Sequence, residues 1–210
     1  EILRRLAGLE GVYVPALYQV SYHADGTLAS FAPADSAAPA RVKRRVVKDL
    51  NAAIYPKKIP VPYTEIVHDR IVLEIMRGCT RGCRFCQAGF SCRPVRRKSA
   101  PVLYRQAVEM LENSGNNEIT LSSLSTSDYR GLKELTDELL PYCEANHVSL
   151  SVPSLRADNF SRELMEKLQA VRKSGLTFAP EAGTQRLRDV INKNLKEEEI
   201  LSTCAQAFAG

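Results

Sequence analysis

Residues 79–86 read Cys79-Thr80-Arg81-Gly82-Cys83-Arg84-Phe85-Cys86 and place three cysteines within eight residues. The spacing C-x3-C-x2-C lets one short loop bring three thiolates to a single metal centre. A [4Fe–4S] cluster contains four irons and is usually held by four cysteines, so a three-cysteine loop would leave one iron open to a small molecule. This stretch therefore predicts a reactive iron–sulfur cluster in preference to a structural metal site.

A fourth thiolate could come from Cys92, which lies six residues beyond Cys86. A closed four-cysteine site would hold zinc or a non-catalytic cluster. Zinc sites usually combine two closely spaced ligand pairs separated by a longer loop, and C-x3-C-x2-C-x5-C differs from that arrangement. The remaining cysteines, Cys143 and Cys204, fall on predicted helices, where we expect small buried core residues.

The chain resembles the radical S-adenosylmethionine (radical SAM) enzymes, whose signature is matched by the three cysteines and by Phe85 before the last of them. It is most similar to a subgroup that usually carries an upstream cobalamin-binding domain. The similarity to this subgroup is carried by five short sequence motifs: His68-Asp69-Arg70, Glu74-Ile75-Met76-Arg77-Gly78-Cys79, Cys86-Gln87-Ala88-Gly89, Pro153-Ser154-Leu155-Arg156 and Ala179-Pro180-Glu181-Ala182-Gly183-Thr184. The cobalamin signature Asp-x-His-x-x-Gly is absent, so cobalamin is expected only through a domain that this chain lacks.

Strands and helices alternate from Ile71 onward, which is typical of parallel βα units. The predicted strands are 71–76, 118–122, 148–152 and 176–179. The predicted helices are 101–113, 132–145 with Ser127 and Asp128 as cap candidates, 162–172 capped by Ser161, 185–192 and 197–208. The resemblance implies a partial parallel (β/α)6 barrel, so we expect an α/β fold truncated after about four βα units. The chain is expected to be a fragment of a longer protein.

Residues 1–70 are predicted to form an N-terminal extension and linker, and residues 71–210 the radical SAM core, incomplete at its C-terminus. Residues 1–10 have helical spacing, and the alternating stretch 12–22 is followed by Asp25-Gly26, a strong β-hairpin signal.

The composition, 44% hydrophobic and 25% charged residues, is that of an ordinary globular domain. No apolar run approaches the roughly 20 residues that span a bilayer, and no signal peptide opens the chain. Cluster thiolates need a reducing compartment, so we expect a cytoplasmic protein without a membrane partner.

The net charge of +5 is concentrated in the basic runs 41–48 and 93–98. No aromatic residues interleave these runs, so nucleic acid is not indicated as a partner.

Ligands of parallel βα folds bind at the carboxyl ends of the strands. The cysteine loop and residues 122–128, 153–156 and 180–184 each follow one of the four predicted strands. The resemblance implies that Cys79, Cys83 and Cys86 hold a [4Fe–4S] cluster and that Phe85 packs near the adenine of SAM. It further implies SAM contacts from Ser122, Ser123, Arg156 and Glu181. The alternatives are core packing for Phe85, helix capping for the serines, an ordinary ion pair for Arg156 and a helix N-terminal role for Glu181.

The resemblance implies a radical SAM enzyme, in which the reduced cluster cleaves SAM and the resulting 5′-deoxyadenosyl radical abstracts a hydrogen atom from a substrate that the sequence leaves unknown. A reductant protein would supply the electron, and no residue is assigned as catalytic. The alternative is a non-catalytic four-cysteine module, stabilised by zinc or an iron–sulfur cluster, that could bind nucleic acid. Replacing Cys92 distinguishes the two hypotheses.

Overall fold

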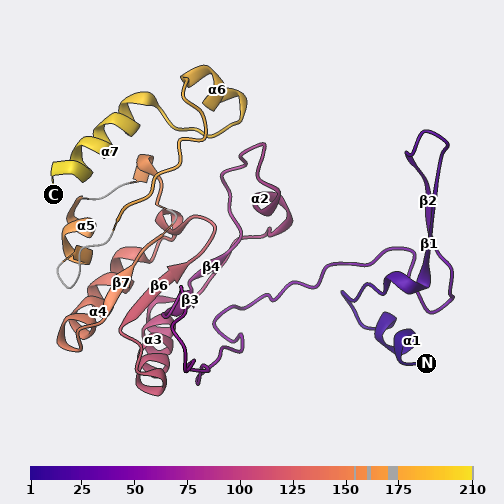
Figure 1. Cartoon of the computed structure of the whole chain (residues 1–210), viewed down its shortest axis with the longest axis horizontal. Coiled ribbons are helices and arrows are strands. Elements are labelled where there is room, and N and C mark those ends of the chain that lie inside the picture. The colour runs from indigo at the N-terminus through magenta and orange to yellow at the C-terminus, as the bar shows by residue number, and fades with distance from the viewer. Residues whose placement is uncertain (154, 160–161, 170–174, 210) are drawn as a thin grey trace. The chain divides into compact units, whose positions relative to one another are not determined.

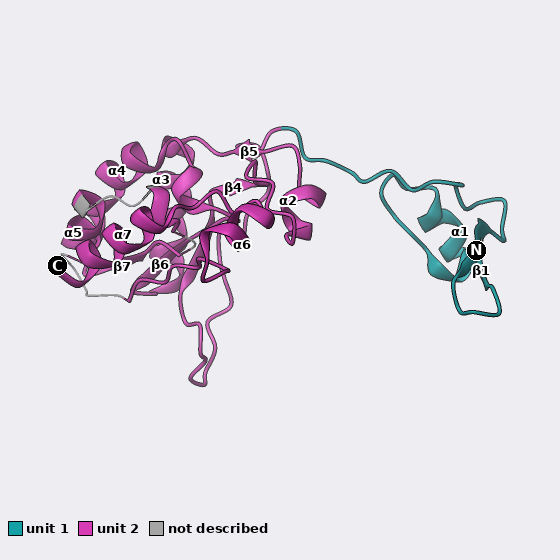
Figure 2. Ribbon diagram, turned by 90° about the horizontal axis from the view of Figure 1, so that it is seen from above, with its two compact units in different colours: residues 1–48 teal, residues 49–210 magenta. Residues whose placement is uncertain are grey.

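The computed structural model describes residues 1–153, 155–159, 162–169 and 175–209. The chain forms two compact units, residues 1–48 and 49–210 (Figure 2). The boundary between the units lies upstream of the domain boundary expected at residue 70. No helix in the described ranges has the length and apolar character needed to cross a membrane.

The first unit consists of a short helix and a β-hairpin. Helix α1 (Ile2–Ala7) is followed by a 3-10 turn (Pro15–Leu17) and by the antiparallel strands β1 (Tyr18–Tyr22) and β2 (Leu28–Pro33). The predicted hairpin is confirmed, and its turn is stabilised by the Asp25 carboxylate, which accepts hydrogen bonds from the amide and hydroxyl of Thr27. Strand β1 begins later than predicted because Pro15 starts the 3-10 turn.

The second unit is built on a three-stranded parallel sheet, with β6 (Glu118–Ser122) between β3 (Ile71–Glu74) and β7 (Ser149–Ser151) (Figure 1). Helix α3 (Ala100–Ser114) lies in the connection from β3 to β6, and α4 (Leu132–Ala145) connects β6 to β7. The predicted α/β alternation is therefore confirmed over this part of the chain, and the bounds of β6 and α4 agree with the sequence.

The two faces of this sheet differ because the side chains of each strand alternate between them. Buried Ile71, Leu73, Ile119, Leu121 and Leu150 pack with the apolar side chains of α3 and α4 in one core. The intervening positions are mostly polar: Glu74, Thr120, Ser122, Ser149 and Ser151. Cys143 of α4 lies in the core as predicted, and burial raises the pKa of its thiol to about 11.

The first strand is shorter than predicted because the chain leaves the parallel sheet after Glu74. Strand β4 (Met76–Arg77) instead pairs antiparallel with β5 (Arg96–Arg97). This ribbon brackets the cysteine loop and the short helix α2 (Gln87–Ser91).

The segment after β7 departs further from the sequence prediction. Residues 175–180 contain no strand, so the prediction of a fourth strand at 176–179 is wrong. A segment with a strand-like composition becomes a strand only where a neighbouring strand pairs with it. Helices α5 (Arg162–Gln169), α6 (Gln185–Val190) and α7 (Glu197–Ala209) lie where helices were expected, although α6 ends two residues earlier than predicted. Residues 170–172, the predicted end of α5, lie outside the described residues. Ser161, the predicted cap of α5, lies outside the described residues.

The expected caps of α4 also need correction. Its N-cap residue is Gly131, while Ser127 and Asp128 belong to a separate 3-10 turn (Thr126–Asp128). The Asp128 carboxylate instead accepts hydrogen bonds from the side chains of Arg81 and Ser125.

Gly78 fixes how the chain leaves β4 for the cysteine loop. Its φ of +88° lies in the left-handed region, and a Cβ there would approach the Cys92 carbonyl oxygen to 2.7 Å. Gly78→Ala should lower the free energy of unfolding by about 3 kcal/mol, because backbone strain and a backbone clash add together. The measurement is urea denaturation followed by circular dichroism.

Gly115→Ala is the matched control. Gly115 also has a positive φ, +72°, but a Cβ there would meet nothing within 4 Å. Only the conformational cost of about 1 kcal/mol is expected. Equal losses in the two variants would contradict the clash at Gly78.

Candidate functional site

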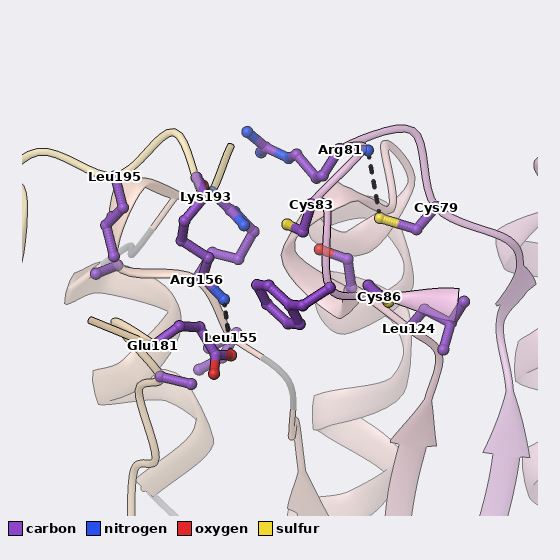
Figure 3. Close-up of a pocket in the computed structure, with 14 residues that line it drawn as sticks. Cys79, Arg81, Cys83, Cys86, Leu124, Leu155, Arg156, Glu181, Lys193 and Leu195 are labelled. Carbon is purple, nitrogen blue, oxygen red and sulfur yellow. Dashed lines mark hydrogen bonds and ion pairs between the residues drawn. The ribbon is translucent and has the colours of Figure 1, made fainter. Parts of the chain in front are cut away.

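A cavity of about 250 Å³ lies beyond the carboxyl ends of the parallel strands (Figure 3). The cysteine loop contributes Cys79, Arg81, Cys83, Phe85 and Cys86 to its lining. The loops after β6 and β7 and the chain on either side of α6 supply the remaining residues: Leu124, Ser125, Leu155, Arg156, Ala157, Ala179, Glu181, Lys193 and Leu195.

Six of the residues singled out from the sequence line this one cavity: Cys79, Cys83, Phe85, Cys86, Arg156 and Glu181. Ser122 and Ser123 are not among the lining residues. The Ser122 carbonyl accepts a hydrogen bond from the Ile75 amide, and the Ser123 hydroxyl lies 3.0 Å from that of Thr126. From this loop Leu124 and Ser125 line the cavity instead, and neither was singled out from the sequence; the Ser125 hydroxyl donates to Asp128 Oδ2 at 2.7 Å.

The cysteine loop curls back on itself through backbone contacts to its own sulfur atoms. Gly82 adopts a φ of +73°, which favours glycine at this position. The Cys79 Sγ accepts a hydrogen bond from the Arg81 amide at 3.4 Å, and the Cys86 Sγ accepts one from the Gly89 amide at 3.3 Å. Cys86 thereby caps α2 with its side chain. The two amides thereby fix the positions of the Cys79 and Cys86 sulfur atoms in the loop.

The cysteines do not converge on a single point. In the ranges that the structure describes, no three His, Cys, Asp or Glu side chains gather closely enough to hold one metal ion. In a four-iron cluster each cysteine binds a different iron, so its ligands need not meet at one atom. Three sulfur-bearing side chains that line a common cavity fit that wider arrangement.

Arg81 ties the cysteine loop to the loops that follow β6 and β7. Its Nε donates to Asp128 Oδ2 at 2.8 Å, a second nitrogen bonds the other Asp128 oxygen, and Nη1 lies 3.0 Å from Asp158 Oδ2. Burial alone would raise the pKa of Asp128, but the hydrogen bonds from Arg81 and Ser125 hold that pKa below its usual value. The hydrogen bond to Asp128 in turn raises the pKa of Arg81.

The chain after α6 holds the loop from the other side. Asn192 donates its side-chain amide to the Gly82 carbonyl at 2.9 Å, and the Arg84 amide donates to the Ile191 carbonyl at 2.9 Å. Buried Arg188 donates to the carbonyls of Ala182 and Leu195, each at 3.0 Å, and so fixes the segments before and after α6. No motif predicts these contacts, because they join residues more than 100 positions apart or end on backbone carbonyls.

Two cations face the cavity from this side. Lys193 Nζ lies 3.1 Å from Glu181 Oε1 and 5.9 Å from the centre of the Phe85 ring. Arg156 pairs with Asp158, with Nε 2.9 Å from Oδ1, and donates to the Lys193 carbonyl. The ion-pair alternative for Arg156 is therefore present in the structure. Lys193 was missed from the sequence because nothing near it in the chain marks a site.

Cys92 is not among the residues that line the cavity. It forms the C-cap of α2, and its Sγ lies 3.9 Å from the Ser91 hydroxyl. The geometry therefore does not favour the four-cysteine alternative.

Comparison with known proteins agrees with this geometry. The family model described as the Radical SAM superfamily matches residues 73–209. The chain is also 35% identical, over 160 residues and 76% of its length, to an uncharacterized protein of Methanocaldococcus jannaschii, of which it covers 34%. It thus spans about a third of that relative. The match covers more than half of the chain and includes the cysteine loop. The chain therefore belongs to the radical SAM superfamily.

Proposed function

We propose that this chain is the catalytic domain of a radical SAM enzyme, with Cys79, Cys83 and Cys86 as ligands of a [4Fe–4S] cluster. The observation that carries the proposal is that these three cysteines line one cavity while Cys92 does not. When bound, the cluster supplies the electron that cleaves SAM to methionine and a 5′-deoxyadenosyl radical, the species that abstracts hydrogen from the substrate. A separate reductant protein in the cytoplasm would reduce it. Cobalamin, if the whole protein uses it, would need a domain other than the one described here.

The chain's own residues would hold the ligand sulfur atoms in place. The backbone amides of Arg81 and Gly89 contact the Sγ atoms of Cys79 and Cys86, and the Arg81 side chain links the cysteine loop to Asp128 and Asp158. These contacts support a loop whose sulfur positions are set by its own backbone and by the neighbouring loops.

SAM would bind across the same cavity. Phe85, 53% exposed, offers a ring face to the adenine, and Glu181 offers a carboxylate to the ribose or the amino group. Arg156 remains a candidate for the SAM carboxylate, although Asp158 already pairs with it. Ser122 and Ser123 have less support, because neither is among the residues that line the cavity.

Anaerobic reconstitution with iron and sulfide, followed by EPR of the reduced protein with and without SAM, tests the proposed function. We expect a [4Fe–4S]⁺ signal that changes when SAM is added, because SAM would occupy the open iron. A cluster signal that is indifferent to SAM, or stoichiometric zinc in place of iron, would contradict the proposal.

The ligand set can be tested by two single substitutions. Cys86→Ala should abolish most of the reconstituted cluster, because it removes one of three thiolates. Cys92→Ala should leave iron and sulfide content unchanged, because this thiol lies away from the cavity. Iron, sulfide and visible absorbance give the readout, and equal losses in both variants would revive the four-cysteine alternative.

The role of Arg81 predicts a compensating pair of variants. Arg81→Gln leaves Asp128 and Asp158 without their shared cation, so we expect a loss of about 1–3 kcal/mol in the free energy of unfolding and a lower cluster yield. Adding Asp128→Asn removes the carboxylate charge that Arg81 bonds with two nitrogens and should restore part of the loss, while Asp158 keeps its ion pair with Arg156. Strictly additive effects, measured by urea denaturation and iron content, would show that the two residues act independently.

Lys193 is the cation best placed to receive an anionic part of SAM, because its ammonium faces both Glu181 and Phe85 inside the cavity. Lys193→Gln should weaken SAM binding to the reconstituted protein by about tenfold, the effect of losing one hydrogen bond to a charged group. Lys196→Gln, three residues away and outside the cavity lining, is the control. Calorimetric titration with SAM measures both, and equal affinities would remove Lys193 from the site.

A further inference from the structure

Three aromatic rings gather on one face of the hairpin in the first unit. The rings of Tyr18 and Phe31 stack with centroids 5.1 Å apart and planes 8° apart. The Tyr13 ring lies 4.9 Å from Tyr18 and 6.1 Å from Phe31. Strand register places Val20 opposite Phe31, on the same face, whereas Ser21 and Ser30 bond to each other across the other face. The hairpin therefore has one aromatic face and one small polar face.

This aromatic face is exposed within residues 1–48. Tyr13 and Phe31 expose 46% and 47% of their surface, and every residue of β2 is exposed. Towards the hairpin tip, Tyr22 and Leu28, which pair with each other, are more exposed still. A contiguous apolar surface of this kind on a small unit marks a binding site, since water contact with it is unfavourable.

A basic segment runs beside the aromatic face. Residues 36–48 contain five Lys or Arg and no Asp or Glu. The Tyr18 hydroxyl donates to the Pro39 carbonyl at 2.8 Å. Two residues before Tyr13, a Cβ at Gly11 would lie 3.1 Å from the Arg45 Cβ, so the segment passes close to this part of the chain. Arg41 and Lys43 also line a cavity of about 360 Å³ beside the end of α1.

We propose that residues 1–48 bind single-stranded nucleic acid. Bases would stack on the ring surface of Tyr13, Tyr18 and Phe31, and phosphates would contact the cations of residues 41–48. Sites for single strands combine these two elements, because every base has a π-face and every nucleotide carries a negative charge. A purely apolar partner would leave the cations unused, and a purely acidic one would leave the rings unused. The 360 Å³ cavity is within the size range of small-ligand pockets, so it could receive one nucleotide.

The inference goes beyond the radical SAM activity and does not depend on it. Sequence reasoning missed it because the aromatic residues at 13, 18 and 31 are separated in the chain from the basic run at 41–48. Folding of the hairpin brings the rings together, and packing against Gly11 brings the basic segment to them.

The test measures binding of a fluorescently labelled oligouridylate of about 12 nucleotides to the full 210-residue chain, by fluorescence anisotropy at low salt. We expect saturable binding that weakens as salt rises and that unlabelled oligothymidylate displaces. Poly-L-glutamate, a polyanion without bases, should compete poorly. An absence of binding at low salt, or equal competition by poly-L-glutamate, would overturn the proposal, the latter by showing that charge alone is recognised.

Variants separate the stacking contribution from the charge contribution. Tyr13→Ala and Phe31→Leu should each weaken binding at least about fivefold, because each removes a ring that stacks a base. Phe31→Leu retains apolar bulk, so the hairpin can keep its fold. Tyr63→Ala, which removes a fully exposed ring from the other unit, should have no effect.

The pair Arg41→Gln and Lys43→Gln should lower the slope of log affinity against log salt by about 1.4, as expected for two lost phosphate contacts to a single strand. Lys58→Gln, a single substitution in the second unit, should leave the slope unchanged. Binding that is insensitive to both ring variants, or a slope unchanged by the charge variants, would overturn the proposed site.

Discussion

The candidate site depends on the guanidinium of Arg81, which is shared between Asp128 and Asp158. These two carboxylates belong to loops after different strands, and both are mostly buried. Without this cation the two carboxylates would repel each other more strongly and lose the Arg81 hydrogen bonds that help to offset their desolvation, keeping Ser125 on Asp128 and Arg156 on Asp158. A planar fork can bond one carboxylate with two nitrogens and reach a second carboxylate with a third. The cysteine loop is therefore positioned by the two loops that it must face in order to close a cavity.

Backbone strain is concentrated in the same region. Glu181, Asn192 and Asn194 are three of the four non-glycine residues with positive φ in the described ranges, and all three lie in the segment that closes the cavity. Each such residue costs roughly 1–3 kcal/mol, so the surrounding contacts must hold it in place. Buried Arg188 and the Asn192 side chain supply those contacts. The strain thus accompanies the placement of Glu181 and Lys193 beside Phe85.

Sequence reasoning succeeded where local pattern and tertiary structure agree. Strand β6 and helix α4 have a clear hydrophobic period, and their bounds agree with the predicted ones. Cys79, Cys83 and Cys86, which the spacing predicts as cluster ligands, line one cavity. The fourth strand failed because an extended, apolar segment needs a partner that composition cannot guarantee. Ser125, rather than Ser122 or Ser123, lines the cavity, and its hydroxyl donates to Asp128, a contact that the composition of the loop does not specify. Arg81 stood inside the motif, but its two acids lie 47 and 77 residues away.

The cavity in residues 49–210 and the aromatic face in residues 1–48 differ in the groups that they offer to a ligand. The cavity of about 250 Å³ is lined largely by residues that the cluster and SAM would contact, so it offers few groups to recognise a large substrate. Binding energy from parts of a substrate remote from the reacting atom can still promote reaction, because it offsets the cost of orienting that atom. A separate unit with stacking rings and cations can supply such energy for a polymer. Recognition of a polymer would therefore need groups outside this cavity, and the rings and cations of residues 1–48 are of the kind that single-stranded nucleic acid binds.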